Sequence, residues 1–149
     1  MSLFFDPKLS KLPLGFHLDF KVSPTPQALN RLLAKSSRET HPPRKLVKAL
    51  ENSYCNISII ESKTSNLVGF VRITSDKGLN ANLWDLAAEP GKYQSQFFSV
   101  LVNMALATIK RELPGCSISL AAPLTAIKSL EQQGFLMDPN GIRVMAYRL

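Results

Sequence analysis

The sequence predicts an α+β domain, in which a mixed, mostly antiparallel central sheet carries helices on both faces. Residues 16–22 alternate apolar and polar side chains, which is typical of a half-buried strand. Two apolar segments, 55–61 and 67–75, are separated by the short polar turn 62–66, so they must pair as antiparallel strands. A long helical pattern at 97–113 lies between two further expected strands, and such a passage favours a parallel crossover.

Two short helices are expected between the first strand and the hairpin. Ser-Pro-Thr-Pro at positions 23–26 supplies a capping hydroxyl and a proline suited to a first helical turn. A second helix begins near Pro43, after the break at His41-Pro42. The residues that define the two apolar faces are Leu29, Leu32 and Leu33, followed by Leu46, Val47 and Leu50.

The second half of the chain completes the sheet and adds two helices. Pro90-Gly91 ends a strand, and Pro114-Gly115 stops the longest helix. Gly134 is suited to a left-handed helix terminus. The expected elements are a strand at 80–88, a helix at 97–113, a strand at 117–121, a helix at 124–133 and an edge strand at 144–148.

Length and composition indicate one globular domain over residues 1–149, with residues 1–15 as an N-terminal arm. The chain is 45% hydrophobic and 19% charged, which is typical of a folded soluble domain. No apolar run approaches the roughly 18 residues of a membrane span, and no secretory signal is recognisable. Cys55 and Cys116 lie far apart without metal-ligand spacing. We therefore expect a cytoplasmic location, buried thiols, no metal and no membrane partner.

The net charge of +7 has two interpretations. A basic face would attract an anionic ligand. Alternatively, scattered lysines and arginines simply keep the surface hydrated. The basic clusters at 44–48 and 110–111 are short and lack interleaved aromatic residues, so no nucleic-acid partner is expected.

Three segments, in their order along the chain, carry a family resemblance. They are LVGFVRITSD at 67–76, NLWDLAAEPGKYQ at 82–94 and LEQQGF at 130–135. This order resembles the GNAT superfamily of N-acetyltransferases, most closely its plastid and cyanobacterial branch, over about residues 29–147. The resemblance implies the three-layer acyl-CoA N-acyltransferase fold, acetyl-CoA as co-substrate and a primary amine as acceptor.

The resemblance also implies a cofactor strip. The backbone of Leu86, Ala87 and Ala88 would hold the pantetheine arm, and the start of the long helix would bind the pyrophosphate. Three glycines of the family turn are replaced here, so either the turn is reshaped but usable, or Phe97 is a core residue and the anion site is lost. The residues of this turn are Gln94, Ser95, Gln96, Phe97, Phe98 and Ser99, with Ser95, Phe97 and Ser99 at the glycine positions.

The catalytic positions of the family are altered as well. Pro123 stands where the branch has an aspartate, and Leu130 stands where it has a proton-donating tyrosine. Asp85 is left as a base or water-orienting group, and Tyr93 as a substitute acid. A hydrogen-bonded strand carboxylate and a packing tyrosine are the structural alternatives. Arg72 is expected to form a structural pair.

The two histidines are not expected to be catalytic, because neither His17 nor His41 has a cysteine, serine or acidic partner at motif spacing. The resemblance thus implies an acyl-CoA-dependent N-acetyltransferase for a small-molecule or peptide amine, with a homodimer as a possible assembly. The alternative is a catalytically inactive GNAT-fold protein that serves as a binding or regulatory module.

Overall fold

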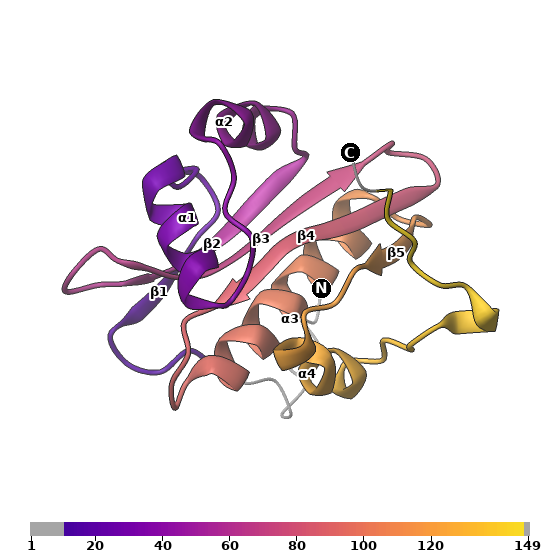
Figure 1. Ribbon diagram of the computed structural model, residues 1–149. Helices are drawn as coiled ribbons and strands as arrows, with labels where there is room; N and C mark the ends of the chain where they lie inside the picture. The colour runs from indigo at the N-terminus through magenta and orange to yellow at the C-terminus, as the bar shows by residue number, and fades with distance from the viewer. Residues whose placement is uncertain (1–10, 148–149) are drawn as a thin grey trace.

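The structure, a computed structural model, describes residues 11–147 (Figure 1). Its elements follow the predicted order of one strand, two helices, three strands, a helix, a strand and a helix. Their bounds are β1 Phe16–Asp19, α1 Pro26–Lys35, α2 Pro43–Glu51, β2 Cys55–Glu61, β3 Leu67–Ser75, β4 Asn80–Ala88, α3 Gln94–Glu112, β5 Ser117–Leu120 and α4 Ile127–Gln132, with short 3₁₀ turns at Leu124–Ala126 and Pro139–Gly141.

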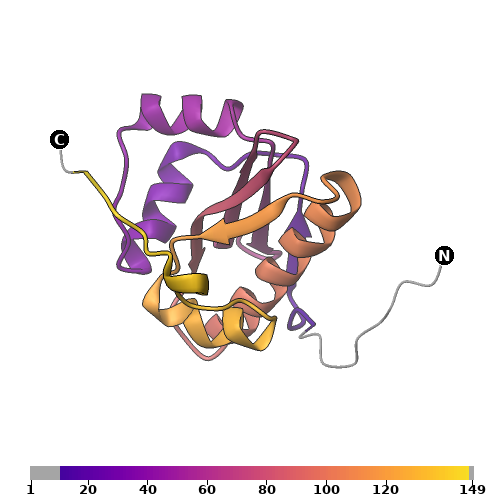
Figure 2. The same ribbon diagram turned by 90° about the vertical axis from the view of Figure 1, so that its right-hand side faces the viewer.

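The five strands form one mixed sheet in the order β1-β2-β3-β4-β5. The first three pairings are antiparallel, and β5 pairs parallel to β4 after the crossover through α3. Figure 2 shows the sheet between two layers, with α1 and α2 on one face and α3 and α4 on the other. The predicted fold class and the parallel crossover are confirmed.

Each face of the sheet has its own apolar core, because side chains alternate across a strand. Phe70 and Ala87 point toward α1 and α2, whereas Val71, Leu83 and Leu86 point toward α3. The α1–α2 core consists of Leu29, Leu32, Leu33, Leu46 and Leu50 around Phe70 and Ala87. The α3 core includes Ile57, Ile59, Val68, Ile73, Phe97, Phe98, Leu101, Val102, Ala105 and Ile109.

Two expected strands end differently. The first strand was expected to reach Val22 but stops at Asp19, because the Asp19 carboxylate accepts hydrogen bonds from the N–H groups of Lys21 and Val22 at 2.9 and 3.2 Å and turns the chain. The predicted edge strand at 144–148 is wrong over its described part. Residues 142–147 are exposed and unpaired, and Figure 2 shows them leaving the domain.

The helices begin and end close to the predicted residues. Thr25 caps α1, since its hydroxyl accepts from the Ala28 N–H at 3.1 Å. The expected helix at 124–133 is divided into a 3₁₀ turn and α4. Helix α3 starts at Gln94, three residues earlier than expected, and this places the whole predicted anion turn inside its first two turns.

The N-terminal arm is partly described, and the two cysteines, which were expected to be buried, are free and half-buried. Residues 1–10 of the expected arm lie outside the described residues, while Leu12 packs against the α3 core and the Gln96 amide donates to the Lys11 carbonyl. Burial raises the pKa of the Cys55 thiol to about 11. Within residues 11–147, no helix is long and apolar enough to cross a membrane.

We predict that the turn between β3 and β4 makes stability depend on acid pH. The Asp76 carboxylate accepts hydrogen bonds from the N–H groups of Asn80, Gly78 and Leu79, and these bonds lower its pKa from 3.8 to about 2. A lowered folded-state pKa stabilises the protein above about pH 4, and this contribution is lost as the pH falls to about 2.

Asp76→Asn keeps the acceptor oxygen but cannot titrate, so it is the matched variant. The difference in unfolding free energy between wild type and Asp76→Asn should be constant from neutral pH to about pH 4 and shrink below it. Urea melts across this pH range measure the difference in unfolding free energy. A difference that does not change with pH would contradict the assignment of the acid-pH dependence to Asp76.

Candidate active site

The edge of β4 that faces β5 is open over its second half. Pairing with β5 covers residues 80–83 and ends at Leu83 opposite Leu120. No described strand pairs with that edge of β4 beyond this point. Since the backbone groups of an unpaired strand can bond to an extended ligand, this edge can bind the pantetheine arm of CoA.

A β-bulge shapes this open segment. Arg72 on β3 is opposite Trp84, and Phe70 is opposite Ala87, so one residue of β3 faces the two residues Asp85 and Leu86 of β4. Asp85 has a φ of +55°, in the left-handed region that aspartate tolerates better than most residues. The bulge bends β4 next to the predicted cofactor strip.

The backbone groups of the three residues in that strip do not all point to the open edge of β4. The Glu89 N–H donates to the Val68 carbonyl at 2.8 Å, so Glu89 faces β3 and, by alternation, Ala88 and Leu86 face the open edge. Ala87 faces β3, and the backbone contact predicted for it is therefore not available at the open edge. The Ala88 carbonyl is already bonded to the Gln94 side-chain amide at 3.1 Å and to the Ser36 hydroxyl at 3.0 Å.

The N-terminus of α3 lies at the end of this edge. No side chain caps the helix, and Tyr93 is its N-cap residue. The Gln94 N–H bonds to the Gly91 carbonyl at 3.2 Å, whereas the N–H groups of Ser95 and Gln96 have no acceptor among the described residues. Free N–H groups at a helix start attract an anion.

Phe97 and Phe98 belong to the core rather than to this anion site. Their exposed fractions are 3% and 1%, and the Phe97 N–H is bonded to the Tyr93 carbonyl at 2.9 Å. The Phe97 ring stacks edge-on against Phe16 of β1, with centroids 5.0 Å apart. The sequence had left open whether Phe97 fills the anion space, and the structure places its ring on the β1 side of the helix.

Ser95 and Ser99 lie on the opposite side of α3, which faces α4. The Ser129 hydroxyl donates to the Ser95 carbonyl at 3.4 Å, and the Gln133 amide donates to the Ser99 carbonyl at 2.9 Å. Ser95 is exposed. Ser95 and Ser99, the two small residues at glycine positions of the family, therefore lie on one side of the helix start. Phe97, the bulky replacement, points to the other side.

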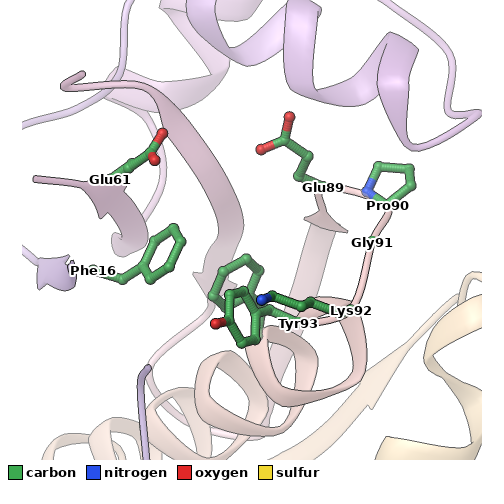
Figure 3. A pocket seen from close by; sticks show the side chains of 8 residues that line it. Phe16, Glu61, Glu89, Pro90, Gly91, Lys92 and Tyr93 are labelled. Atoms are coloured by element: carbon green, nitrogen blue, oxygen red, sulfur yellow. The ribbon is translucent and has the colours of Figure 1, made fainter. Parts of the chain in front are cut away.

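Tyr93 lies away from the open edge of β4. Its ring contacts Phe16, with centroids 5.7 Å apart, and the Lys92 ammonium lies 4.8 Å above its face. Figure 3 shows it in a cavity of about 230 Å³ that Glu61, Glu89 and Lys92 also line. This position on the β1 side favours the packing alternative for Tyr93 over the role of acid.

Asp85 lies on the α1–α2 face in a network of charged groups. Its Oδ2 accepts from Arg72 Nε at 2.9 Å, and its Oδ1 is 3.6 Å from His41 Nε2. The side chains of Arg72 and Asp85 are only 16% and 13% exposed, whereas His41 is 40% exposed. Arg72 also donates to the Ser53 hydroxyl at 3.3 Å. The expected structural pair of Arg72 is thus with Asp85.

His41 is the residue that spacing along the sequence could not reveal. Its backbone is held by Asn30 of α1, whose side chain accepts from the His41 N–H at 2.9 Å and donates to the His41 carbonyl at 2.8 Å. This reciprocal pair fixes the loop between α1 and α2 beside β4. His17, by contrast, bonds to the Ser62 hydroxyl at 2.8 Å at the β1 edge of the sheet.

The altered family positions lie near the helix α4. Leu130 is 3% exposed and packs in the α3 core, and Pro123 precedes the 3₁₀ turn that leads into α4. Among residues 11–147, no group of three or more histidine, cysteine or acidic side chains could hold a metal ion. Asp85, which directly precedes the open strip, and His41, 3.6 Å from it, are the titratable pair next to this part of β4.

Comparison with known proteins gives one class of relative, although no family model matches the chain. The chain is 34% identical to an uncharacterised N-acetyltransferase, ycf52, of Pyropia yezoensis, over 70% of the chain and 60% of that protein. It is 32% identical to the histone acetyltransferase TAP1 of Glycine max, over 78% of the chain and 54% of that protein. The chain thus spans little more than half the length of these relatives.

Solved structures share the fold. A probable acetyltransferase of unknown function from meticillin-resistant Staphylococcus aureus superimposes with a TM-score of 0.79 at 20% identity, covering 90% of this chain and 99% of that one. A glucosamine-6-phosphate N-acetyltransferase from Arabidopsis thaliana superimposes with a TM-score of 0.68 at 13% identity, covering 89% and 97%. These superpositions show that the chain shares the fold of the two proteins.

Proposed function

The chain belongs to the GNAT superfamily of N-acetyltransferases, and from this premise we propose that it transfers an acetyl group from acetyl-CoA to a primary amine of a small molecule or peptide. The relatives named as N-acetyltransferases support the reaction class. The acceptor and the use of acetyl-CoA are our own inference from the site.

One observation carries the proposal. The open edge of β4 at Leu86 and Ala88 leads directly into the uncapped N-terminus of α3. An extended pantetheine arm can bond to the first, and the pyrophosphate can lie at the N–H groups of Ser95 and Gln96. We leave Phe97 and Phe98 out of this anion site, because both side chains are buried in the core.

The residues present define what catalysis can use. The nitrogen of the amine attacks the thioester carbonyl carbon, a C–N bond forms, and the C–S bond breaks with its electron pair going to the CoA sulfur. With Leu130 at the position of the family's tyrosine, no phenol protonates the thiolate there. Catalysis would then depend on positioning and on backbone N–H groups that polarise the carbonyl.

We keep three further expectations as proposals. The family resemblance suggests a homodimer, and the composition and motifs of the sequence suggest a cytoplasmic location and no nucleic-acid partner. A relative from Arabidopsis thaliana is named as chloroplastic, so imaging of the tagged protein in its host is the test of the compartment.

A charge placed at the helix start tests CoA binding. Ser95 is exposed, and a carboxylate in the first turn of a helix favours helix stability while repelling a second anion. Ser95→Asp should therefore weaken acetyl-CoA binding at least about tenfold in calorimetry, with an unchanged or higher melting temperature.

Ser95→Ala is the matched control, since it removes the hydroxyl without adding charge and should bind within about threefold of wild type. Equal affinity of all three proteins would place the pyrophosphate elsewhere. No binding by the wild type at millimolar acetyl-CoA would favour the alternative of a non-catalytic module with this fold.

A further inference from the structure

His41 and Asp85 lie together beside the predicted thioester site. Asp85 directly precedes Leu86, the first residue of the open cofactor strip, so the two groups are next to the point where the acetyl carbonyl would lie. They are on the α1–α2 face of the sheet, opposite the face covered by α3. A second substrate approaching from this face would meet the more exposed of the two, His41.

The geometry of Asp85 argues against its acting as the base itself. Its Oδ2 is bonded to Arg72, its Oδ1 faces His41, and only 13% of its side chain is exposed. A carboxylate that is bonded to an arginine and shielded from solvent has little access to a substrate. It is better suited to orient a neighbouring imidazole than to take a proton from a substrate.

His41 has the accessibility and the orientation that Asp85 lacks. Its side chain is 40% exposed, and Nε2 is the nitrogen that faces Asp85, at 3.6 Å. A proton on Nε2 would leave the lone pair on Nδ1, which has no hydrogen-bond partner among residues 11–147. The Asn30 pair fixes the loop that carries the ring.

We propose, on the basis of the proposed acetyltransferase function, that His41 is the general base that removes a proton from the acceptor ammonium, and that Asp85 positions it. The proton of R–NH₃⁺ passes to Nδ1, and the free amine then attacks the thioester. The leaving CoA thiolate takes the second proton from the nitrogen, and the amide and the CoA thiol are released. His41 then gives the proton it had accepted to water.

The acceptor class follows from this chemistry. A base is needed only by an amine that is protonated at neutral pH, such as an aliphatic primary amine or a lysine side chain. The charged groups that face His41 are Asp85 on β4 and, through it, Arg72 on β3. Arg72 and Asp85 together are close to neutral. Once His41 has taken the proton from the acceptor, the positive charge on its ring lies next to the Asp85 carboxylate.

His41→Gln tests the proposal with two probe amines in an assay of released CoA thiol. Ethylamine is protonated at neutral pH, whereas O-methylhydroxylamine is not, so only ethylamine needs the base. With wild-type protein as reference, His41→Gln should lower kcat for ethylamine by about 10²-fold and for O-methylhydroxylamine by less than about tenfold. His17→Gln, the other histidine, should leave both rates unchanged.

The controls separate this inference from the proposed function. Equal losses for both amines, or none for either, would overturn the role of His41 while acetyl transfer stands. A wild type that binds acetyl-CoA but acetylates neither amine would overturn acetyl transfer and this inference with it. Asp85→Asn should lower kcat for ethylamine at constant KM, as loss of a positioning residue would.

Discussion

Replacement of Phe97 by alanine is expected to lower the free energy of unfolding by about 3–5 kcal/mol. The ring is 3% exposed and packs against Phe16 and Tyr93, with centroids 5.0 and 6.0 Å away. Its loss opens a cavity between α3 and β1 that the sheet cannot close by a small shift. Chemical denaturation of the purified protein measures the change.

Phe20→Ala is the matched control, because Phe20 is 47% exposed and should cost no more than about 1 kcal/mol. The stability of Phe97→Ala also shows whether the Phe97 ring belongs to the core or blocks the anion site at the start of α3. If Phe97→Ala instead kept its stability and bound CoA more tightly than wild type, the ring would be an obstacle at the anion site rather than part of the core.

The second large loss of folding stability is expected when the ion pair of Arg72 and Asp85 is broken. Both side chains are more than four-fifths buried, with exposed fractions of 16% and 13%. Breaking such a pair leaves one charge without its partner, so Arg72→Met and Asp85→Asn should each cost about 2–4 kcal/mol of stability. The double variant should cost less than the sum of the two, because no isolated charge is left.

A surface pair in the same protein supplies the control. Lys35 and Glu89 are 2.7 Å apart but 51% and 34% exposed, so Lys35→Met should cost less than about 1 kcal/mol. Urea melts of the five proteins complete the comparison. Additive losses for Arg72 and Asp85 would show that the two side chains act independently, and Asp85 would then be free to act as a base.

The order of elements and the fold class could be predicted from the sequence because they depend on local patterns. Alternation identified β1, a short polar turn between two apolar segments identified β2 and β3, and leucines at helical spacing identified α1 and α2. The segments around Trp84 and Gly134 carried the family resemblance, because they could be recognised directly in the order of residues along the chain.

Other features depended on how the elements meet in space. The predicted strand at 144–148 has the composition of a strand, but pairing needs a neighbouring edge, and residues 142–147 leave the sheet. Phe97 stands at a glycine position of the family, yet the direction in which its ring points is set by the rotation of α3 against β1. Neither property is encoded in the residues next to it.

The site shows the same division. The sequence alone identified Asp85 as the surviving acidic group and Ser95 as a replacement at the helix start. Only the tertiary structure brought His41, from a loop between two helices, to 3.6 Å from Asp85 on a central strand. Spacing along the chain predicts contacts within an element, whereas a contact between distant segments is decided by packing of helices on the sheet, which no local pattern records.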